Sequence, residues 1–443
     1  MTMNEITRRD FVKTAAATTI LLGTSRTAWA GANDRVRVAV MGLNGRGKSH
    51  LNGYGKLENV EVATLCDPDS GLFAPTTKAF FTDKNLPAPK LEQDLRRVLE
   101  DKSIDAISLA TPNHWHSLAT IWACQAGKDV YVEKPMTHNI FEGQKVVEAA
   151  KKYKRIVQHG TQLRSNPGFQ EGIKLLHDGA IGKVYLCRTV CYKWRPDIGK
   201  AVAGKPPAAL DWNVWQGPAR EEPFMVDAKG EGVFVHYNWH WHWAYGNGDI
   251  GNQGVHQLDA ARWGLGVGLP YRVTSMGGML LWSDAKQIFD VSATSFMFKG
   301  KDGQDKMMTL EVRPWMTNDE AGGTSFGVIF YGEKGWMTFP DYGSYKMYEG
   351  RENKLVKEGK NGTDLNHYRN FIECVRSRDA AAVTAPPIEG HWSSALSHYA
   401  LTGARVNRVL EIDPATELVR NDAEANKMLT REYRAPFEVP KSV

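Results

Sequence analysis

The segment 238–256, NWHWHWAYGNGDIGNQGVH, concentrates side chains that can do chemistry. It holds three histidines, three tryptophans and four glycines in nineteen residues. Imidazoles bind metals and exchange protons near neutral pH, and indole rings offer flat apolar surfaces with one polar atom. The segment therefore indicates a metal site, a structural polar layer, or a place where a substrate is held.

The first part of this segment is open to a metal or a substrate interpretation. If residues 235–243 are extended, side chains alternate between two faces. One face then carries Tyr237, Trp239, Trp241 and Trp243, and the other carries His236, Asn238, His240 and His242. Two histidines two apart on a strand suit zinc, but no third ligand stands at a diagnostic spacing, so we expect no metal. We expect Trp239, His240 and His242 to face a substrate, with a purely structural layer as the alternative.

The elements that position such a site begin near the N-terminus. Alternating valines from Val36 predict a buried strand, followed by the glycine turn GLNGRG at 42–47 and a helix over 48–57. A second apolar strand over 60–65 ends at Asp67. Glycines let the backbone approach a pyrophosphate at a helix N-terminus, and an acid after the second strand accepts ribose hydroxyls. The predicted dinucleotide-binding residues here are Gly42, Asn44, Gly45, Arg46, Gly47 and Asp67.

Two further strands, over 104–110 and 129–132, end in polar residues. The carboxyl ends of parallel strands line the ligand crevice of an open sheet. We therefore add Thr111, Asn113, His116, Glu133 and Lys134 to the cofactor side. Alternatively, Asn113 and His116 only cap the next helix, and Lys134 is only solvated. Asp67 favours NAD over NADP because it repels a 2′-phosphate, although Arg46 and Lys48 offer charges that can hold one.

Together these motifs resemble the Gfo/Idh/MocA family, named for glucose–fructose oxidoreductase and inositol dehydrogenase. The resemblance rests on GLNGRG at 42–47, CDPD at 66–69, ATPNHWH at 110–116, EKP at 133–135 and GVHQLD at 254–259. It implies a Rossmann domain and an α/β domain with a large open sheet. It also implies hydride transfer between a nicotinamide and a sugar or cyclitol hydroxyl, with Lys134 at the reacting centre.

The resemblance further implies an aspartate and a histidine four residues apart, which match Asn252 and His256. The histidine is present, but an asparagine can only orient a hydroxyl and cannot accept its proton. We therefore predict His256 as the base, Lys134 as the group that stabilises the alkoxide, and Asn252 as an orienting residue. Asp249 is a candidate for the missing carboxylate. Alternatively, His256 only bonds the backbone at a helix start.

The fold class predicted is α/β in two domains. Residues 34–157 form the Rossmann domain, and residues 158–443 form an α/β domain for substrate and oligomerisation, with a large, mainly antiparallel or mixed sheet. Its strands are expected over 184–191, 272–276, 292–298, 307–312, 325–331 and 335–339. Helices are expected over 364–377 and 391–410, and residues 414–443 form an arm over the surface. A homo-oligomer is expected because an open sheet face commonly implies self-association.

The first thirty residues indicate export. Arg8 and Arg9 precede a short apolar run, and Ala28 and Ala30 suit a signal peptidase, so residues 1–30 are predicted to be a Tat signal leading to the periplasm. The mature chain is expected to have no membrane span. The five cysteines are odd in number and form no CxxC pair, so buried thiols are expected. A net charge of +5 without a basic tract argues against nucleic acid.

Three functions are compatible with these features. The preferred one is an exported NAD-dependent oxidoreductase that holds its cofactor tightly and acts on a sugar, glycoside or cyclitol. The second is a redox-neutral NAD-dependent glycosidase or lyase acting through a transient keto-sugar. The third is a sugar- or nucleotide-binding protein without catalysis.

Overall fold

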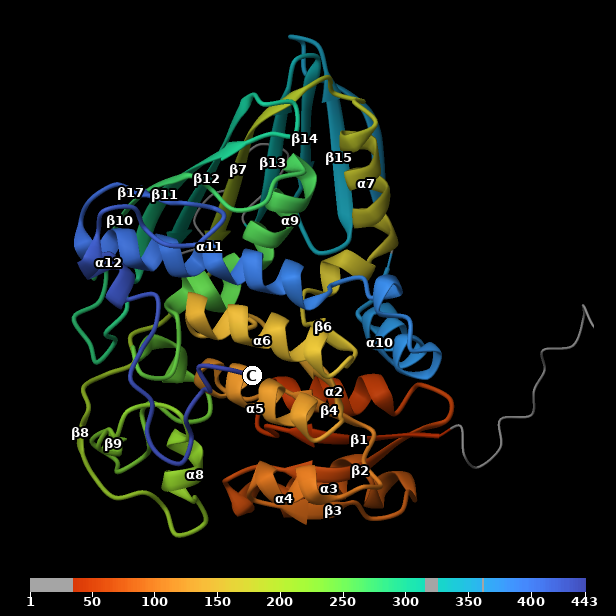
Figure 1. Ribbon diagram of the computed structural model, residues 1–443, viewed down its shortest axis with the longest axis vertical. Helices are drawn as coiled ribbons and strands as arrows, with labels where there is room; N and C mark the ends of the chain where they lie inside the picture. The colour runs from red at the N-terminus through yellow and green to blue at the C-terminus, as the bar shows by residue number, and fades with distance from the viewer. Residues whose placement is uncertain (1–34, 315–325, 361) are drawn as a thin grey trace, which may run out of the picture. The chain divides into compact units, whose positions relative to one another are not determined.

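A computed structural model describes residues 35–314, 326–360 and 362–443 (Figure 1). The predicted signal segment, 1–30, lies outside these residues. Val36–Val443 pack into one unit that contains two large sheets. None of the helices in the described ranges combines the length and apolarity that crossing a membrane would require.

The first sheet is parallel and has the order β3-β2-β1-β4-β5-β6. Its strands are β1 Val36–Met41, β2 Val60–Cys66, β3 Lys90–Glu92, β4 Ala106–Leu109, β5 Asp129–Val132 and β6 Val157–His159. Its helices are α2 Arg46–Tyr54, α3 Phe73–Phe80, α4 Leu95–Glu100, α5 Asn113–Gln125 and α6 Ile140–Lys152. β1 and β4 are neighbours although two strands separate them in the chain, so the strand order reverses at β1. This reversal leaves a crevice at the carboxyl ends of β1 and β4.

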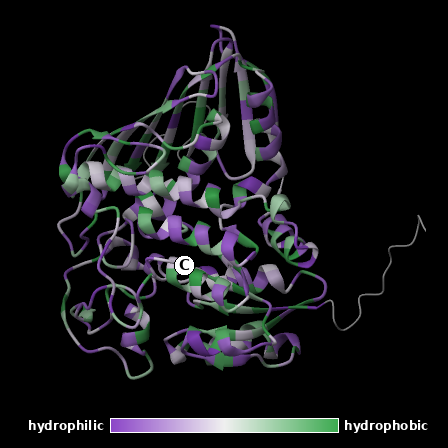
Figure 2. Ribbon diagram, in the orientation of Figure 1, coloured by the Kyte–Doolittle hydropathy of each residue, from purple (hydrophilic) through white to green (hydrophobic). Residues whose placement is uncertain are grey.

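Within the described residues, the second sheet has nine strands, in the order β16-β15-β14-β13-β7-β12-β11-β10-β17. They are β7 Val184–Tyr192, β10 Arg272–Gly278, β11 Val291–Lys299, β12 Asp305–Arg313, β13 Phe326–Gly332, β14 Gly335–Phe339, β15 Ser344–Glu349, β16 Lys354–Lys360 and β17 Leu410–Glu411. Only β7 and β12 pair in parallel among these strands. The mixed, mainly antiparallel sheet is as predicted, and buried residues alternate with more exposed ones along β11. Figure 2 shows hydrophilic and hydrophobic residues intermixed along the strands of this sheet.

Helices α7 Pro167–His177, α9 Val255–Leu265 and α11 Pro387–Val406 pack on this sheet. α11 also packs on α6 of the first sheet, so it lies between the two halves (Figure 1). Helix α10 Leu365–Ser377 and the last residues complete the core around the first sheet. Phe437 is fully buried there, so the predicted surface arm is anchored by apolar side chains.

One local prediction is wrong. Residues 235–243 are not extended, because Asn238–Trp241 forms a 3₁₀ turn preceded by His236 at φ +63°. His240 and Trp241 are consequently buried side by side, and the expected separation into two faces does not occur. A π-helical turn from Ile250 to Gly254 then runs directly into α9. The prediction of buried thiols is confirmed for all five cysteines.

Candidate active site

A cleft of about 220 Å³ opens at the carboxyl ends of β1, β2, β4 and β5. Eight predicted cofactor residues line it: Gly42, Asn44, Gly45, Arg46, Asp67, Thr111, Glu133 and Lys134. Tyr237, Trp239, His240 and Asn252 contribute from the second half of the chain. The cleft therefore combines the reversal point of the first sheet with one wall from the other domain.

The glycine turn suits an anion because its backbone is crowded on one side and open on the other. A Cβ on Gly42, which has φ +88°, would lie 2.5 Å from the Ala110 carbonyl oxygen, and one on Gly47 would lie 1.8 Å from the Gly42 oxygen. A Cβ on Gly45 would meet nothing within 4 Å. Gly45 caps α2 without a side-chain hydrogen bond. The first N–H groups of the helix thus lack a side-chain acceptor and can meet a pyrophosphate.

Asp67 lies where a ribose-binding acid is expected. Its carboxylate accepts hydrogen bonds from the backbone N–H of Leu43 at 2.8 Å and of Asp69 at 2.9 Å. Burial raises the pKa of Asp67 to about 6, although these two N–H groups oppose the shift. Two carboxylate oxygens have more acceptor positions than these bonds use, so an ionised Asp67 can still accept ribose hydroxyls.

Arg46 does not support the NADP alternative. Its Nε donates to Glu133 at 2.8 Å, and its terminal nitrogens lie 3.5 Å from Asp364. Glu133 also accepts from His50 at 3.2 Å. Burial alone would raise the pKa of Glu133, but Arg46 and His50 outweigh it and hold the pKa well below its ordinary value. The charge of Arg46 is therefore committed to two acids, not left for a 2′-phosphate.

Lys134 joins the cofactor strand to the other domain. Its Nζ donates to the carbonyl oxygen of Asn252 at 2.6 Å and to the Asn252 Oδ1 at 3.3 Å. Burial lowers the pKa of Lys134 to about 8. At neutral pH the side chain is therefore mainly an ammonium group whose proton is lost more readily than that of an ordinary lysine.

A second cavity of about 220 Å³ adjoins the cleft, since Arg46, Glu133 and Lys134 line both. His256, Gln253, Tyr342, Gln162, Asn166, Leu163, Thr363 and Asp364 line the remainder. The His256 Nδ1 is buried and has no hydrogen-bond partner in the described part of the chain. Burial, and then the charge of Lys134, lower the pKa of His256 well below its ordinary value. A neutral imidazole with one unused nitrogen thus borders this cavity.

Asp249 does not replace the missing carboxylate at the cavity. Its two oxygens pair with Arg195 at 2.5 and 2.6 Å, and both side chains are buried. Burial alone would raise the pKa of Asp249, but Arg195 outweighs it and lowers the pKa. Asn252 Nδ2 lies 3.4 Å from Asp249 Oδ1. The acid therefore helps to orient Asn252 and is not available as a base.

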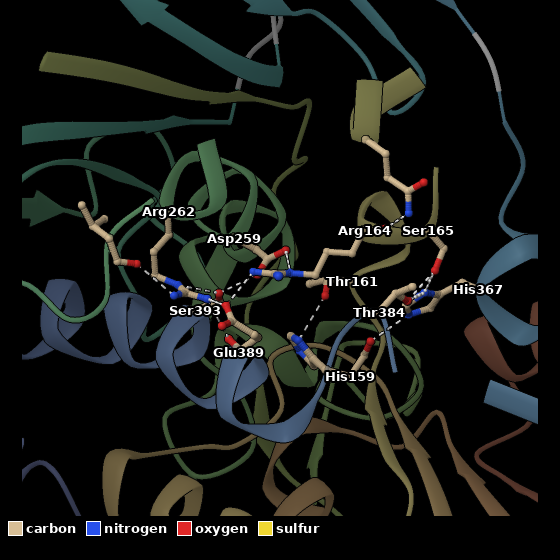
Figure 3. A network of polar contacts seen from close by, with 12 residues as sticks. His159, Thr161, Arg164, Ser165, Asp259, Arg262, His367, Thr384, Glu389 and Ser393 are labelled. Carbon is tan, nitrogen blue, oxygen red and sulfur yellow. Dashed lines mark hydrogen bonds and ion pairs between the residues drawn. The ribbon is translucent and has the colours of Figure 1, made fainter. Parts of the chain in front are cut away.

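A buried ion cluster fixes the helix that carries His256. One turn after His256, Asp259 receives both Nε and a terminal nitrogen of Arg164 at 2.9–3.0 Å and the hydroxyl of Ser393 at 2.6 Å (Figure 3). Glu389 of α11 pairs with Arg164 and with Arg262. This cluster ties α9 to α11 and to the loop after β6, and so it holds His256 in place.

The structure separates the predicted site residues into three groups. Trp239, His240 and Asn252 line the cleft, and His256 lines the second cavity. His242 lies in neither, because it stacks on Tyr245 and packs against Phe234. Three predicted cofactor residues also lie outside the lining of both cavities. Gly47 allows close packing of α2, His116 bonds the Thr111 and Pro135 carbonyls, and Asn113 is buried at the start of α5.

Sequence reasoning missed several lining residues. Gln253 is adjacent to the predicted Asn252, and the loop QHGTQLRSNPGF supplies Gln162 and Asn166, so their neighbours gave some signal. No sequence signal pointed to Tyr342, since it is far from the other lining residues in the chain and belongs to no recognised motif. Its ring centroid lies 5.4 Å from that of His256.

Comparison with known proteins agrees with this geometry. Residues 36–161 match the model of the Gfo/Idh/MocA oxidoreductase family, NAD-binding Rossmann fold, and residues 343–439 match that family's C-terminal alpha/beta domain. The aldose-aldose oxidoreductase of Caulobacter crescentus, solved with glycerol, superposes with a TM-score of 0.64 at 17% identity, covering 85% of this chain and 100% of that one. At this identity the likeness shows the fold alone.

Two curated relatives each match a part of the chain. The scyllo-inositol 2-dehydrogenase (NAD(+)) of Bacillus subtilis is 31% identical over 150 residues, 34% of this chain and 42% of that protein. A glycosyl hydrolase family 109 protein of Shewanella pealeana is 30% identical over 123 residues, 27% of each chain. The chain thus spans less than half the length of these relatives.

Proposed function

Because the chain belongs to the Gfo/Idh/MocA family of oxidoreductases, we propose that it is an NAD-dependent enzyme that oxidises or reduces a CH–OH group of a sugar or cyclitol. The observation that carries the proposal is the position of Lys134, which lines both the dinucleotide cleft and the second cavity. A substrate in that cavity would meet Lys134 at the boundary with the cofactor.

The cleft residues fit NAD. The Gly42–Gly47 turn accepts a pyrophosphate at the start of α2, and Asp67 accepts the ribose hydroxyls and disfavours a 2′-phosphate. NAD supplies the nicotinamide that takes up or releases the hydride. The side chains around the second cavity bind and orient the substrate and transfer its proton.

Proton transfer is assigned to His256. A hydroxyl that becomes a carbonyl must release its proton, and the unpartnered Nδ1 of a neutral imidazole can accept it. Lys134, still protonated below about pH 8, stabilises the negative charge that develops on the oxygen. Asn252, bonded to Lys134 through both its carbonyl and its side chain, holds the ammonium group in place.

A second candidate is a redox-neutral glycosidase or lyase in which the hydride returns to the same sugar. The similarity to a glycosyl hydrolase family 109 protein favours this candidate, because that protein's name is that of a glycoside-cleaving enzyme. We further propose that residues 1–30 direct export and that the cofactor is retained tightly, since an exported enzyme cannot exchange nicotinamides with the cytoplasmic pool.

The test is a sugar and cyclitol panel with the purified full chain, monitored at the NADH absorbance band. The proposal is supported if turnover with NAD falls strongly in the His256→Asn variant and persists in the His177→Asn variant. His177 is the control because it lies outside both cavities. Cleavage of a synthetic glycoside without NADH accumulation selects the redox-neutral candidate. Equal turnover in the two variants, or no binding of NAD to the chain, refutes the assigned site.

A further inference from the structure

A third cavity, of about 400 Å³, shares no lining residue with the cleft or the second cavity in the described ranges. It lies against the same two chain segments that carry Lys134 and Asn252. His138 follows Lys134 by four residues, and Asn247 precedes Asn252 by five. Helix α11 and the segment after α12 Ala423–Lys427 form the other walls.

Buried polar atoms around this cavity lack partners. Asn247 and His398 are each only 5% exposed, and neither Asn247 Oδ1 nor His398 Nδ1 has a hydrogen-bond partner in the part of the chain that the structure describes. The Nε2 of His138 is also buried without a hydrogen-bond partner in the described residues. Buried polar groups are normally hydrogen-bonded, so three unpartnered atoms in residues that line one cavity point to polar contacts that the described chain does not itself supply.

Four basic side chains line the cavity, namely Arg220, Arg405, Lys427 and Arg431. Arg431 pairs with Glu142, and Arg220 pairs with Glu222. Arg405 instead stacks on Trp243, with its guanidinium carbon 4.5 Å from the ring centroid.

Within the described residues, neither Arg405 nor Lys427 has an acidic partner in hydrogen-bond or ion-pair range, and Glu432 is the one acid lining the cavity. Burial lowers the pKa of His398 to about 3, and that of His138 also falls well below its ordinary value, so both imidazoles are neutral. The walls thus offer two uncommitted cations beside neutral hydrogen-bonding groups.

We propose that this cavity is a second ligand site for a sugar that carries an anionic group, either a carboxylate or a phosphate. Arg405 and Lys427 bind the anionic group, because a charge-assisted hydrogen bond is the strongest contact that they can make. Asn247 and His398 bind hydroxyls, and Trp243 supplies a flat apolar face. The site is distinct from the substrate cavity. Its lining includes His138 and Asn247, which belong to the segments that carry Lys134 and Asn252.

The experiment is isothermal titration of the full chain, saturated with NAD, with D-glucuronate, D-glucose 6-phosphate, D-glucose and inorganic phosphate. The test variant is Arg405→Gln/Lys427→Gln. The control variant is Lys301→Gln/Arg351→Gln, which removes two exposed cations that do not line the cavity. We expect one of the two anionic sugars to bind the wild type and the control equally. The test variant should bind it at least about tenfold more weakly, with unchanged NAD affinity.

The comparison of the two anionic sugars identifies whether a carboxylate or a phosphate is preferred, and either preference supports the site. Asn247→Leu removes a hydrogen-bond partner of a sugar hydroxyl but no charge. It should therefore weaken binding of the anionic sugar and leave the affinity for inorganic phosphate unchanged. Binding of neither anionic sugar overturns the proposal, as does equal binding by the test variant. Phosphate binding as tight as that of glucose 6-phosphate also overturns it, because the hydroxyl contacts then contribute nothing.

Discussion

The lowered pKa of Lys134 predicts that removing its charge stabilises the protein while it impairs catalysis. The pKa falls from 10.5 for an ordinary lysine to about 8, and about 2.5 units correspond to about 3 kcal/mol of cost for keeping the ammonium group buried at pH 7. Lys134→Met removes that cost and loses two hydrogen bonds to Asn252, worth about 1 kcal/mol each. Glu133 keeps Arg46 and His50, so no buried anion loses its last partner.

The pH dependence gives the sharper test. A lysine with a lowered folded pKa binds fewer protons in the folded state than in the unfolded state between about pH 8 and 10.5. The cost of burying its charge is therefore complete below pH 8 and disappears as the pH rises to 10.5. Lys134→Met should be more stable than the wild type at pH 7 by about 1 kcal/mol and less stable at pH 10.5.

Thermal unfolding of the two proteins measures this change. At an unfolding entropy of about 2.1 cal/mol/K per residue, a change of about 3 kcal/mol shifts the difference between their thermal midpoints by about 3 °C across that pH range. The kcat of the variant should fall by about 10²–10³-fold. Lys128→Met alters another buried lysine outside both cavities and should leave turnover unchanged. A variant that is less stable by the same amount at pH 7 and 10.5 would refute the reasoning.

Four further outcomes follow from the site. His256→Asn should lower kcat/KM by about 10²–10⁴-fold with NAD affinity unchanged, measured by steady-state kinetics and titration. NAD affinity should fall as the pH drops through about 6, because protonation of Asp67 removes the ribose acceptor, and Asp67→Ser should abolish this dependence in titrations at several pH values. Asn252→Asp places a carboxylate beside the Lys134 ammonium group, which raises its pKa, so the alkaline decline of kcat/KM should move above pH 8. Asp259→Asn leaves buried arginine charge underpaired and should cost about 3–5 kcal/mol in unfolding free energy, seen as a lowered thermal midpoint.

Much of the first domain follows from local sequence patterns. Alternating valines, the glycine turn and the acid after the second strand each depend on neighbours within a few residues. Gly42 and Gly47 follow the same logic, because a positive φ at Gly42 and a close backbone approach at both positions restrict the residue type directly. The ends of β4 and β5 then place Thr111 and Lys134 at the cleft, since parallel strands share one carboxyl edge.

Tertiary packing decided the rest. Local alternation in residues 235–243 favours a strand, but burial of Trp241 in the core and a hydrogen bond from the His240 Nδ1 to the Tyr237 carbonyl, at 2.7 Å, stabilise a turn instead. That turn directs His240 to the cleft and leaves His242 against Tyr245.

The sequence by itself determined the dinucleotide cradle and named Lys134, Asn252 and His256 as the residues for chemistry. Only the tertiary structure brought Lys134 to Asn252 across 118 residues, and placed Tyr342 beside His256. It also placed Asp249 in an ion pair with Arg195. The physical reason is range: turns and strands are set by adjacent residues, whereas the charge state and accessibility of a buried group depend on whatever distant segments pack around it.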